Sequence, residues 1–144
     1  MPIASRRLPG LAVAAIASLG AGAVHAAATG IHAEHVGLAR LFVVAAVAQL
    51  GVGLWGLLRP SKVGAYLIVG VNGAAVVGWL ATRLTGISWI SGLETREAAQ
   101  FADSACALMG AVAAGAALAA CLVGLRDAHP TRIALPSLAV AVLT

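Results

Sequence analysis

The chain has 144 residues, of which 61% are hydrophobic and only 10% are charged. Soluble domains contain about 45–50% apolar and about 25% charged residues, so this composition excludes an ordinary soluble enzyme and a disordered chain. The net charge of +4 comes from scattered basic residues and only 4% of the residues are aromatic, which excludes a nucleic-acid-binding surface. The sequence therefore predicts an integral protein of the plasma membrane, embedded in the lipid bilayer.

Four long apolar stretches follow one another along the chain, separated by Pro, Gly and charged residues. They are residues 8–28, 36–58, 63–84 and 101–125. Each has 21 to 25 residues, enough for a helix that crosses a hydrocarbon core of about 30 Å. The sequence thus predicts an all-α fold, a polytopic four-helix bundle that runs up and down through the membrane over residues 1–128. Residues 129–144 are expected to form a cytoplasmic tail that is interfacial or disordered.

Basic residues beside the stretches predict the orientation of the bundle. Six of them fall on one side, namely Arg6, Arg7, Arg59, Lys62, Arg126 and Arg132. The other side has three, Arg40, Arg83 and Arg96, together with four of the five acidic residues. Because Lys and Arg concentrate on the cytoplasmic side of membrane proteins, both termini are expected in the cytoplasm.

The first stretch has a second interpretation, as a signal peptide. The pair Arg6-Arg7, the apolar run and the sequence Val24-His25-Ala26 resemble a secretory signal with a small-x-small cleavage site. Cleavage after Ala26 would leave three spans. We favour four spans, because the apolar run is long for a signal peptide and further spans follow it.

Polar side chains gather around the first outer connection, residues 29–35. The candidate metal ligands among them are His25, His32, Glu34 and His35. Imidazoles with a carboxylate suit zinc or copper, and Cys106 and Met109 of the fourth stretch would add soft ligands for copper. The alternative is that these histidines are solvated interfacial residues. We prefer the alternative, because no HxxxH or CxxC spacing is present and a nearby guanidinium would repel a divalent ion. No cofactor is therefore expected.

Two amide side chains are expected deep in the membrane. Gln49 lies 13 residues from the outer end of its span and Asn72 lies 12 residues from the outer end of the next. Both positions are about 18–20 Å deep at 1.5 Å per residue. Equal depth in adjacent antiparallel helices predicts a hydrogen bond between the two amides, or a shared partner. A polar step in a transport path is the alternative function for the same residues.

Charged residues near the outer ends of the spans predict an ion pair. Arg40 lies about 6 Å inside the second span, and Asp103 and Arg83 lie at a similar level. A charged group at that depth reaches outward or pairs with an opposite charge. The expected pair is Arg40 with Asp103 or with Glu34, which would clamp the outer end of the bundle.

No pattern typical of an active site is present, and no enzymatic activity is predicted. Cys106 and Cys121 lie 15 residues apart in one span, about 22 Å along a helix, so they cannot form a disulfide with each other there. Two functions remain open. The first is a non-catalytic accessory or structural subunit that associates with other membrane proteins or with itself. The second is an outward-facing module that binds or transports a metal ion or a small solute.

Short motifs along residues 10–125 support a resemblance to a known group of proteins. They are His32-Ala33-Glu34-His35, Ala48-Gln49-Leu50, Arg59-Pro60, Gly70-Val71-Asn72, Arg83-Leu84-Thr85-Gly86-Ile87, and Glu97 followed by Asp103. In this order they resemble small four-helix membrane proteins of actinobacteria. The resemblance implies the four-helix fold and no particular activity. The fourth helix of that group often has a Glu after the Asp, which this chain lacks.

Overall fold

The structure is a computed structural model that describes residues 10–126, in which four α-helices and no strand are found. The helices are α1 (Leu11–Ile31), α2 (Val36–Leu58), α3 (Lys62–Leu84) and α4 (Phe101–Arg126). All four are long and apolar enough to cross a membrane. The predicted all-α fold with four stretches of membrane-spanning length is therefore confirmed. The basic residues Arg6, Arg7 and Arg132, the first residues of the predicted first span and the tail 129–144 lie outside the described residues.

The helix bounds agree with the predicted stretches, except that α1 is displaced toward the C-terminus. The connection expected at residues 29–35 is shorter, because α1 continues through Gly30 to Ile31. His32 ends this helix, and its backbone N–H donates to Ala28 O at 3.2 Å. A glycine inside a helix costs only about 1 kcal/mol relative to alanine, so Gly30 does not stop the helix.

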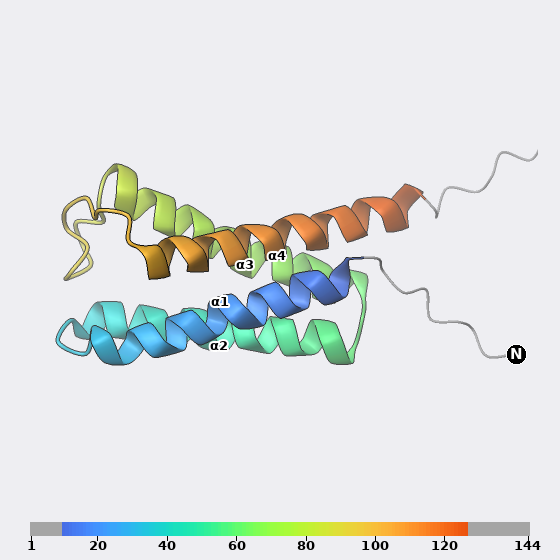
Figure 1. The fold of residues 1–144 in the computed structure, drawn as a ribbon, viewed down its shortest axis with the longest axis horizontal. Helices are drawn as coiled ribbons and strands as arrows, with labels where there is room; N and C mark the ends of the chain where they lie inside the picture. Colours follow the sequence, from blue (N-terminus) through green and yellow to red (C-terminus); the bar gives the residue numbers. More distant parts are fainter. Residues whose placement is uncertain (1–9, 127–144) are drawn as a thin grey trace, which may run out of the picture.

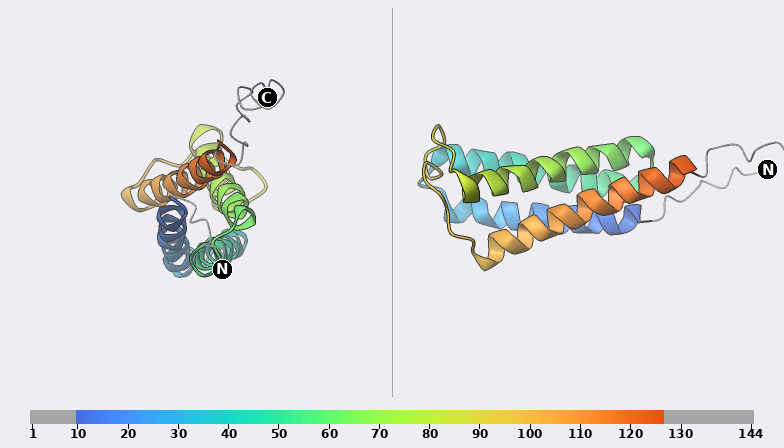
Figure 2. Two further views of the ribbon diagram at one scale, coloured as in Figure 1. Left: turned by 90° about the vertical axis from the view of Figure 1, so that its right-hand side faces the viewer. Right: turned by 90° about the horizontal axis from the view of Figure 1, so that it is seen from above.

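The four helices form a bundle in which each packs along two neighbours, and α1 and α3 also touch across the centre. Helix α1 packs along α2 and α4, and α3 packs along α4 and α2, whereas α2 and α4 lie diagonally opposite without packing together. Figure 1 shows the α1–α2 and α3–α4 connections at one end, which we call the loop end. The short α2–α3 connection lies at the other end, which we call the turn end. The view along the bundle in Figure 2 shows the helices surrounding a common centre.

The α2–α3 connection is set by local chemistry at the turn end. Pro60 disfavours a helical conformation at Arg59, which is the residue that ends α2. Ser61 then begins α3, because its Oγ accepts a hydrogen bond from Gly64 N at 3.1 Å. The Arg59 guanidinium lies 5.7 Å from the centre of the Trp55 ring. These contacts fold the chain back within three residues between the two helices.

Small side chains fill the centre of the bundle, and large ones cover its outside. The buried apolar residues are mostly alanines, including Ala14, Ala15, Ala65, Ala113 and Ala117. A Cβ at Gly53 would lie 2.9 Å from the backbone oxygen of Ala15, so α1 and α2 approach to within backbone contact. Exposed side chains include Val44, Leu58 and Leu108. Small residues inside and large apolar residues outside are typical of helices packed in a lipid bilayer.

Candidate functional site: a buried polar ring joined to a histidine and a cysteine

Three polar side chains from three helices meet in the centre of the bundle. Ser18 of α1, Gln49 of α2 and Asn72 of α3 are each at most 1% exposed. Gln49 Nε2 donates to Asn72 Oδ1 at 3.0 Å, and Asn72 Nδ2 donates to Ser18 Oγ at 2.9 Å. Ser18 Oγ donates to the backbone oxygen of Gln49 at 2.8 Å, which closes the ring. We call these three residues the polar ring. The predicted hydrogen bond between Gln49 and Asn72 is confirmed.

A backbone carbonyl fixes the orientation of both amides in the polar ring. Asn72 Nδ2 also donates to Ile68 O at 3.0 Å, and a carbonyl oxygen can only accept. The nitrogen of Asn72 therefore faces Ile68 and Ser18, and its oxygen faces the nitrogen of Gln49. This leaves Gln49 Oε1 as the atom that lies 2.7 Å from His25 Nδ1. His25 must donate that bond, so the hydrogen-bond pattern assigns the hydrogen to Nδ1 and, in the neutral ring, a lone pair to Nε2.

Cys106 of α4 lies next to His25, at the edge of the polar ring. Its buried Sγ lies 3.5 Å from Ala21 O, which accepts the thiol hydrogen. The same sulfur is 3.6 Å from His25 Nδ1 and 4.0 Å from His25 Nε2. The aromatic ring of Phe42 lies beside the imidazole, with 5.6 Å between the ring centres. All four helices therefore contribute a side chain to the group formed by the polar ring, His25 and Cys106.

The structure does not bring together the four residues that the sequence offered as candidate metal ligands. His25 points toward Gln49. His32 donates from Nδ1 to Ala28 O at 3.0 Å, and its ring packs against Phe42. His35 Nδ1 lies 3.3 Å from Ser91 Oγ of the α3–α4 connection, and Glu34 is exposed. Over residues 10–126, no three His, Cys, Asp or Glu side chains are placed to hold a metal ion. The four candidate ligands do not converge: His25 and His32 both contact Phe42, but they lie seven residues, about 10 Å, apart along α1 and bond to different oxygens.

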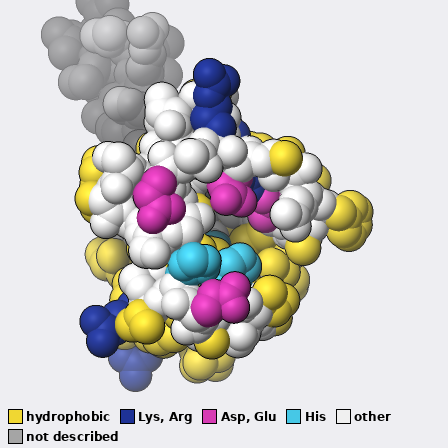
Figure 3. Space-filling model, turned by 90° about the vertical axis from the view of Figure 1, so that its left-hand side faces the viewer, with side chains coloured by type: hydrophobic (Ala, Val, Ile, Leu, Met, Phe, Trp, Pro, Cys, Tyr) yellow, Lys and Arg dark blue, Asp and Glu magenta, His cyan; other side chains and the backbone are white. Residues whose placement is uncertain are grey.

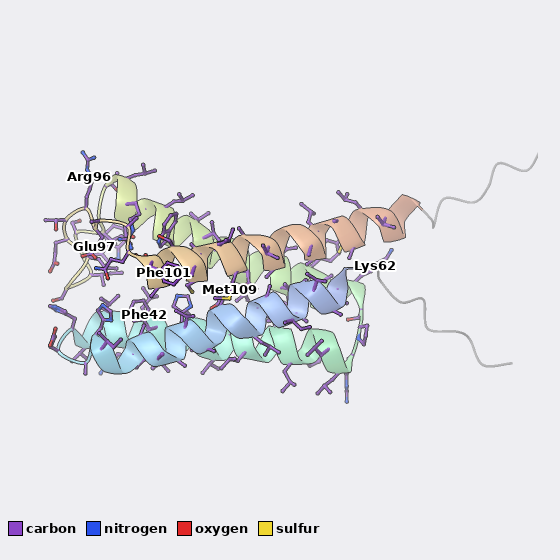
Figure 4. The ribbon with its side chains drawn as sticks, viewed as in Figure 1. Phe42, Lys62, Arg96, Glu97, Phe101 and Met109 are labelled. Carbon is purple, nitrogen blue, oxygen red and sulfur yellow. The ribbon has the colours of Figure 1, made fainter. Side chains whose placement is uncertain are left out.

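An ion-pair cluster ties the α3–α4 connection to the helices at the loop end. Arg83 of α3 forms an ion pair with Asp103 of α4, and its guanidinium lies 3.8 Å from Glu97 Oε2. Glu97 also donates its backbone N–H to Thr82 O at 3.0 Å. Figure 4 labels Glu97 on this connection. Figure 3 looks onto the loop end, where histidine side chains lie near the middle of the face with acidic side chains around them.

The expected ion pair of Arg40 with Asp103 or Glu34 is wrong. Arg40 is exposed and forms no ion pair within the described residues. Arg83 takes its place beside Asp103, because α3 packs against α4 whereas α2 lies diagonally across from it. Arg83 and Asp103 do lie at one level, as the sequence predicted, and the arrangement of the helices decides which residues meet there.

No protein family, curated protein or solved structure matches this chain. The chemistry of the site therefore rests on the groups that it contains. The polar ring consists of two neutral amides and a hydroxyl, and each of their oxygen and nitrogen atoms has a hydrogen-bond partner. Such a ring holds helices in register. The His25 imidazole and the Cys106 thiol lie beside the ring, with 3.6 Å between Nδ1 and Sγ.

Proposed function

We propose that this protein is a non-catalytic membrane-spanning bundle that serves as an accessory or structural subunit of a larger membrane assembly. The closed polar ring carries this proposal. A transport path needs polar groups that exchange partners with a passing solute, whereas Ser18, Gln49 and Asn72 bond to one another and are sealed by small apolar side chains. Interhelical hydrogen bonds of this kind contribute about 0.6–2 kcal/mol each inside a membrane. The ring is thus suited to fixing α1, α2 and α3 relative to one another.

The proposal includes an up-and-down path through the plasma membrane, with both termini in the cytoplasm. Its support is the distribution of charge between the two ends of the bundle. In the sequence, six basic residues adjoin the turn-end side, against three, Arg40, Arg83 and Arg96, on the loop-end side, which also has Glu94, Glu97 and Asp103. Because basic residues concentrate on the cytoplasmic side, the turn end is expected there and the loop end outside. The resemblance to small actinobacterial membrane proteins is part of the same proposal.

The outer face of α3 is the proposed contact with a partner helix. Gly70, Gly73 and Gly78 on this helix have open space where a Cβ would lie, with no atom within 4 Å. Ala74 is also exposed, so the face offers small residues one helical turn apart. Small residues allow the backbone of a second helix to approach closely in lipid.

Native mass spectrometry of the tagged protein, isolated from its own membranes in a mild detergent, tests this function. We expect a stoichiometric protein partner or a defined homo-oligomer. Gly70→Leu should reduce the association, whereas Gly51→Leu should not, because Gly51 is an equally open glycine on a different helix. A protein that remains a partner-free monomer in detergent and in lipid nanodiscs would contradict the proposal. A bound small solute without a partner would favour the binding or transport module.

A further inference from the structure

The two helices joined at the turn end carry the same pair of residue types next to their connection. Arg59 ends α2, and Trp55 lies one helical turn before it. Lys62 is the first residue of α3, and Tyr66 lies one helical turn after it. Residues four apart share one face of a helix, so each cation lies about 6 Å nearer the end of the bundle than its aromatic ring. All four side chains are exposed, Trp55 by 49% and Tyr66 by 53%.

Contacts across the connection hold Trp55 and Arg59 against the start of α3. A Cβ at Gly64 would lie 3.3 Å from Trp55 Cδ1, so the indole of α2 packs on α3 at that glycine. The Arg59 guanidinium is 5.7 Å from the centre of the same indole ring. Gly64 follows Lys62 by two residues, in the first turn of α3. Both cations therefore belong to the tip of the α2–α3 hairpin. We call these four side chains the basic–aromatic patch, namely Trp55, Arg59, Lys62 and Tyr66.

The charge around the basic–aromatic patch is positive. Over residues 10–126, the ion pairs lie at the loop end and involve neither Arg59 nor Lys62. In the sequence, six basic residues and one acidic residue, Asp127, adjoin the turn-end side, and the other four acidic residues adjoin the loop-end side. Figure 4 labels Lys62 at the turn end, at the opposite end of the bundle from Glu97. The patch is therefore suited to an anionic partner.

We propose that the basic–aromatic patch binds the headgroup of an anionic phospholipid. Trp and Tyr rings favour the headgroup level of a bilayer, and Lys and Arg side chains extend from the apolar region toward the phosphates. The order found on both helices, with the ring inside and the cation outside, matches the order of these lipid groups. Leu58 and Val63 next to the cations are 70% and 64% exposed, so acyl chains can lie against them. The phosphate then meets Arg59 and Lys62.

Charge selects the class of lipid. Basic residues beside a membrane attract anionic lipids, and each adds several-fold to the affinity. A zwitterionic headgroup such as phosphatidylcholine brings its own ammonium group into the same positive region, which repels it. The loop end has no such preference, because Arg83 is paired with Asp103 and the acidic residues there balance the basic ones. The site belongs to whichever leaflet holds the turn end, so it does not depend on the orientation of the bundle.

Native mass spectrometry of the purified full-length protein, in detergent mixed with equal amounts of phosphatidylglycerol and phosphatidylcholine, tests this site. We expect the wild type to retain phosphatidylglycerol in preference. Changing both Arg59→Gln and Lys62→Gln should weaken its binding by about tenfold or more. Changing both Arg40→Gln and Arg96→Gln removes the same charge on the loop-end side and should leave the binding unchanged. Equal retention of the two lipids by the wild type, or equal losses in the two double variants, would overturn the proposal.

Quenching of Trp55 fluorescence tests the same site with its charges intact. The chain has three tryptophans, so changing Trp79→Phe and Trp89→Phe leaves Trp55 alone. This variant is placed in phosphatidylcholine bilayers that contain a small fraction of lipid brominated near the top of its acyl chains. We expect brominated phosphatidylglycerol to quench Trp55 at a lower mole fraction than brominated phosphatidylcholine does. Equal quenching by the two lipids would overturn the proposal, and so would displacement of the lipid by free glycerol phosphate, which has no acyl chains.

Discussion

Gln49 of α2 and Asn72 of α3 are joined side chain to side chain by a 3.0 Å hydrogen bond, and both are almost completely buried. Neither residue is held by this bond alone, because Ser18 of α1 links the Asn72 amide to the backbone of Gln49. A buried amide that loses its partner retains the full cost of desolvation. The three helices are therefore fixed together at one level of the bundle.

The first prediction concerns the close approach of α1 and α2. A Cβ at Gly53 would lie 2.9 Å from Ala15 O, and a backbone atom cannot move aside cheaply. Gly53→Ala should destabilise the bundle by about 1–3 kcal/mol, as overpacked cores do. Gly51→Ala, two residues earlier and facing open space, should be neutral or stabilising by up to about 1 kcal/mol. Unfolding in mixed micelles measures both, and equal effects of the two variants would contradict the described packing.

The second prediction concerns the ion pairs at the loop end. Arg83→Ala should destabilise the α3–α4 connection by about 1 kcal/mol, since Arg83 contacts both Glu97 and Asp103 and is partly shielded from water. Arg40→Ala should stay within about 0.5 kcal/mol of the wild type, because Arg40 is exposed. Hydrogen exchange of residues 94–100 should accelerate only in the Arg83 variant. Faster exchange in the Arg40 variant alone would contradict the Arg83 ion pairs and support the pairing of Arg40 with Asp103 or Glu34.

The third prediction concerns the proposed orientation in the membrane. A reporter domain fused after Leu125 should be active in the cytoplasm, and one inserted near Gly92 should be active outside. These two sites lie toward opposite ends of α4, so they should never report the same side. The reverse pattern would place the loop end in the cytoplasm and overturn the charge argument.

The sequence was sufficient for the parts of the fold that depend on position along one helix. Apolar length predicted the helices, and counting residues from the span ends predicted the contact of Gln49 with Asn72. Ser18 was missed, because a single serine within an alanine-rich stretch gives no indication of the direction in which it faces.

The sequence did not predict contacts that depend on the rotation of each helix about its axis or on which helices are adjacent. His25 was grouped with His32, and both do contact Phe42, but the bond of His25 to Gln49 depends on the rotation of α1 against α2, which the sequence does not give. Arg40 and Arg83 have nearly the same depth, and only the diagonal placement of α2 and α4 assigns Asp103 to Arg83. Hydropathy and charge counts contain no information on which helices are adjacent.

A double-mutant cycle between Gln49 and Asn72 tests most directly whether the polar ring is a structural clamp. Gln49→Leu and Asn72→Leu should each lower the free energy of unfolding in micelles by about 1–2 kcal/mol, since each leaves its partner buried without a hydrogen bond. The double variant should lose clearly less than the sum, with a coupling of at least about 0.5 kcal/mol. Additive losses, or single variants as stable as the wild type, would contradict a clamp and favour amides that serve a passing solute.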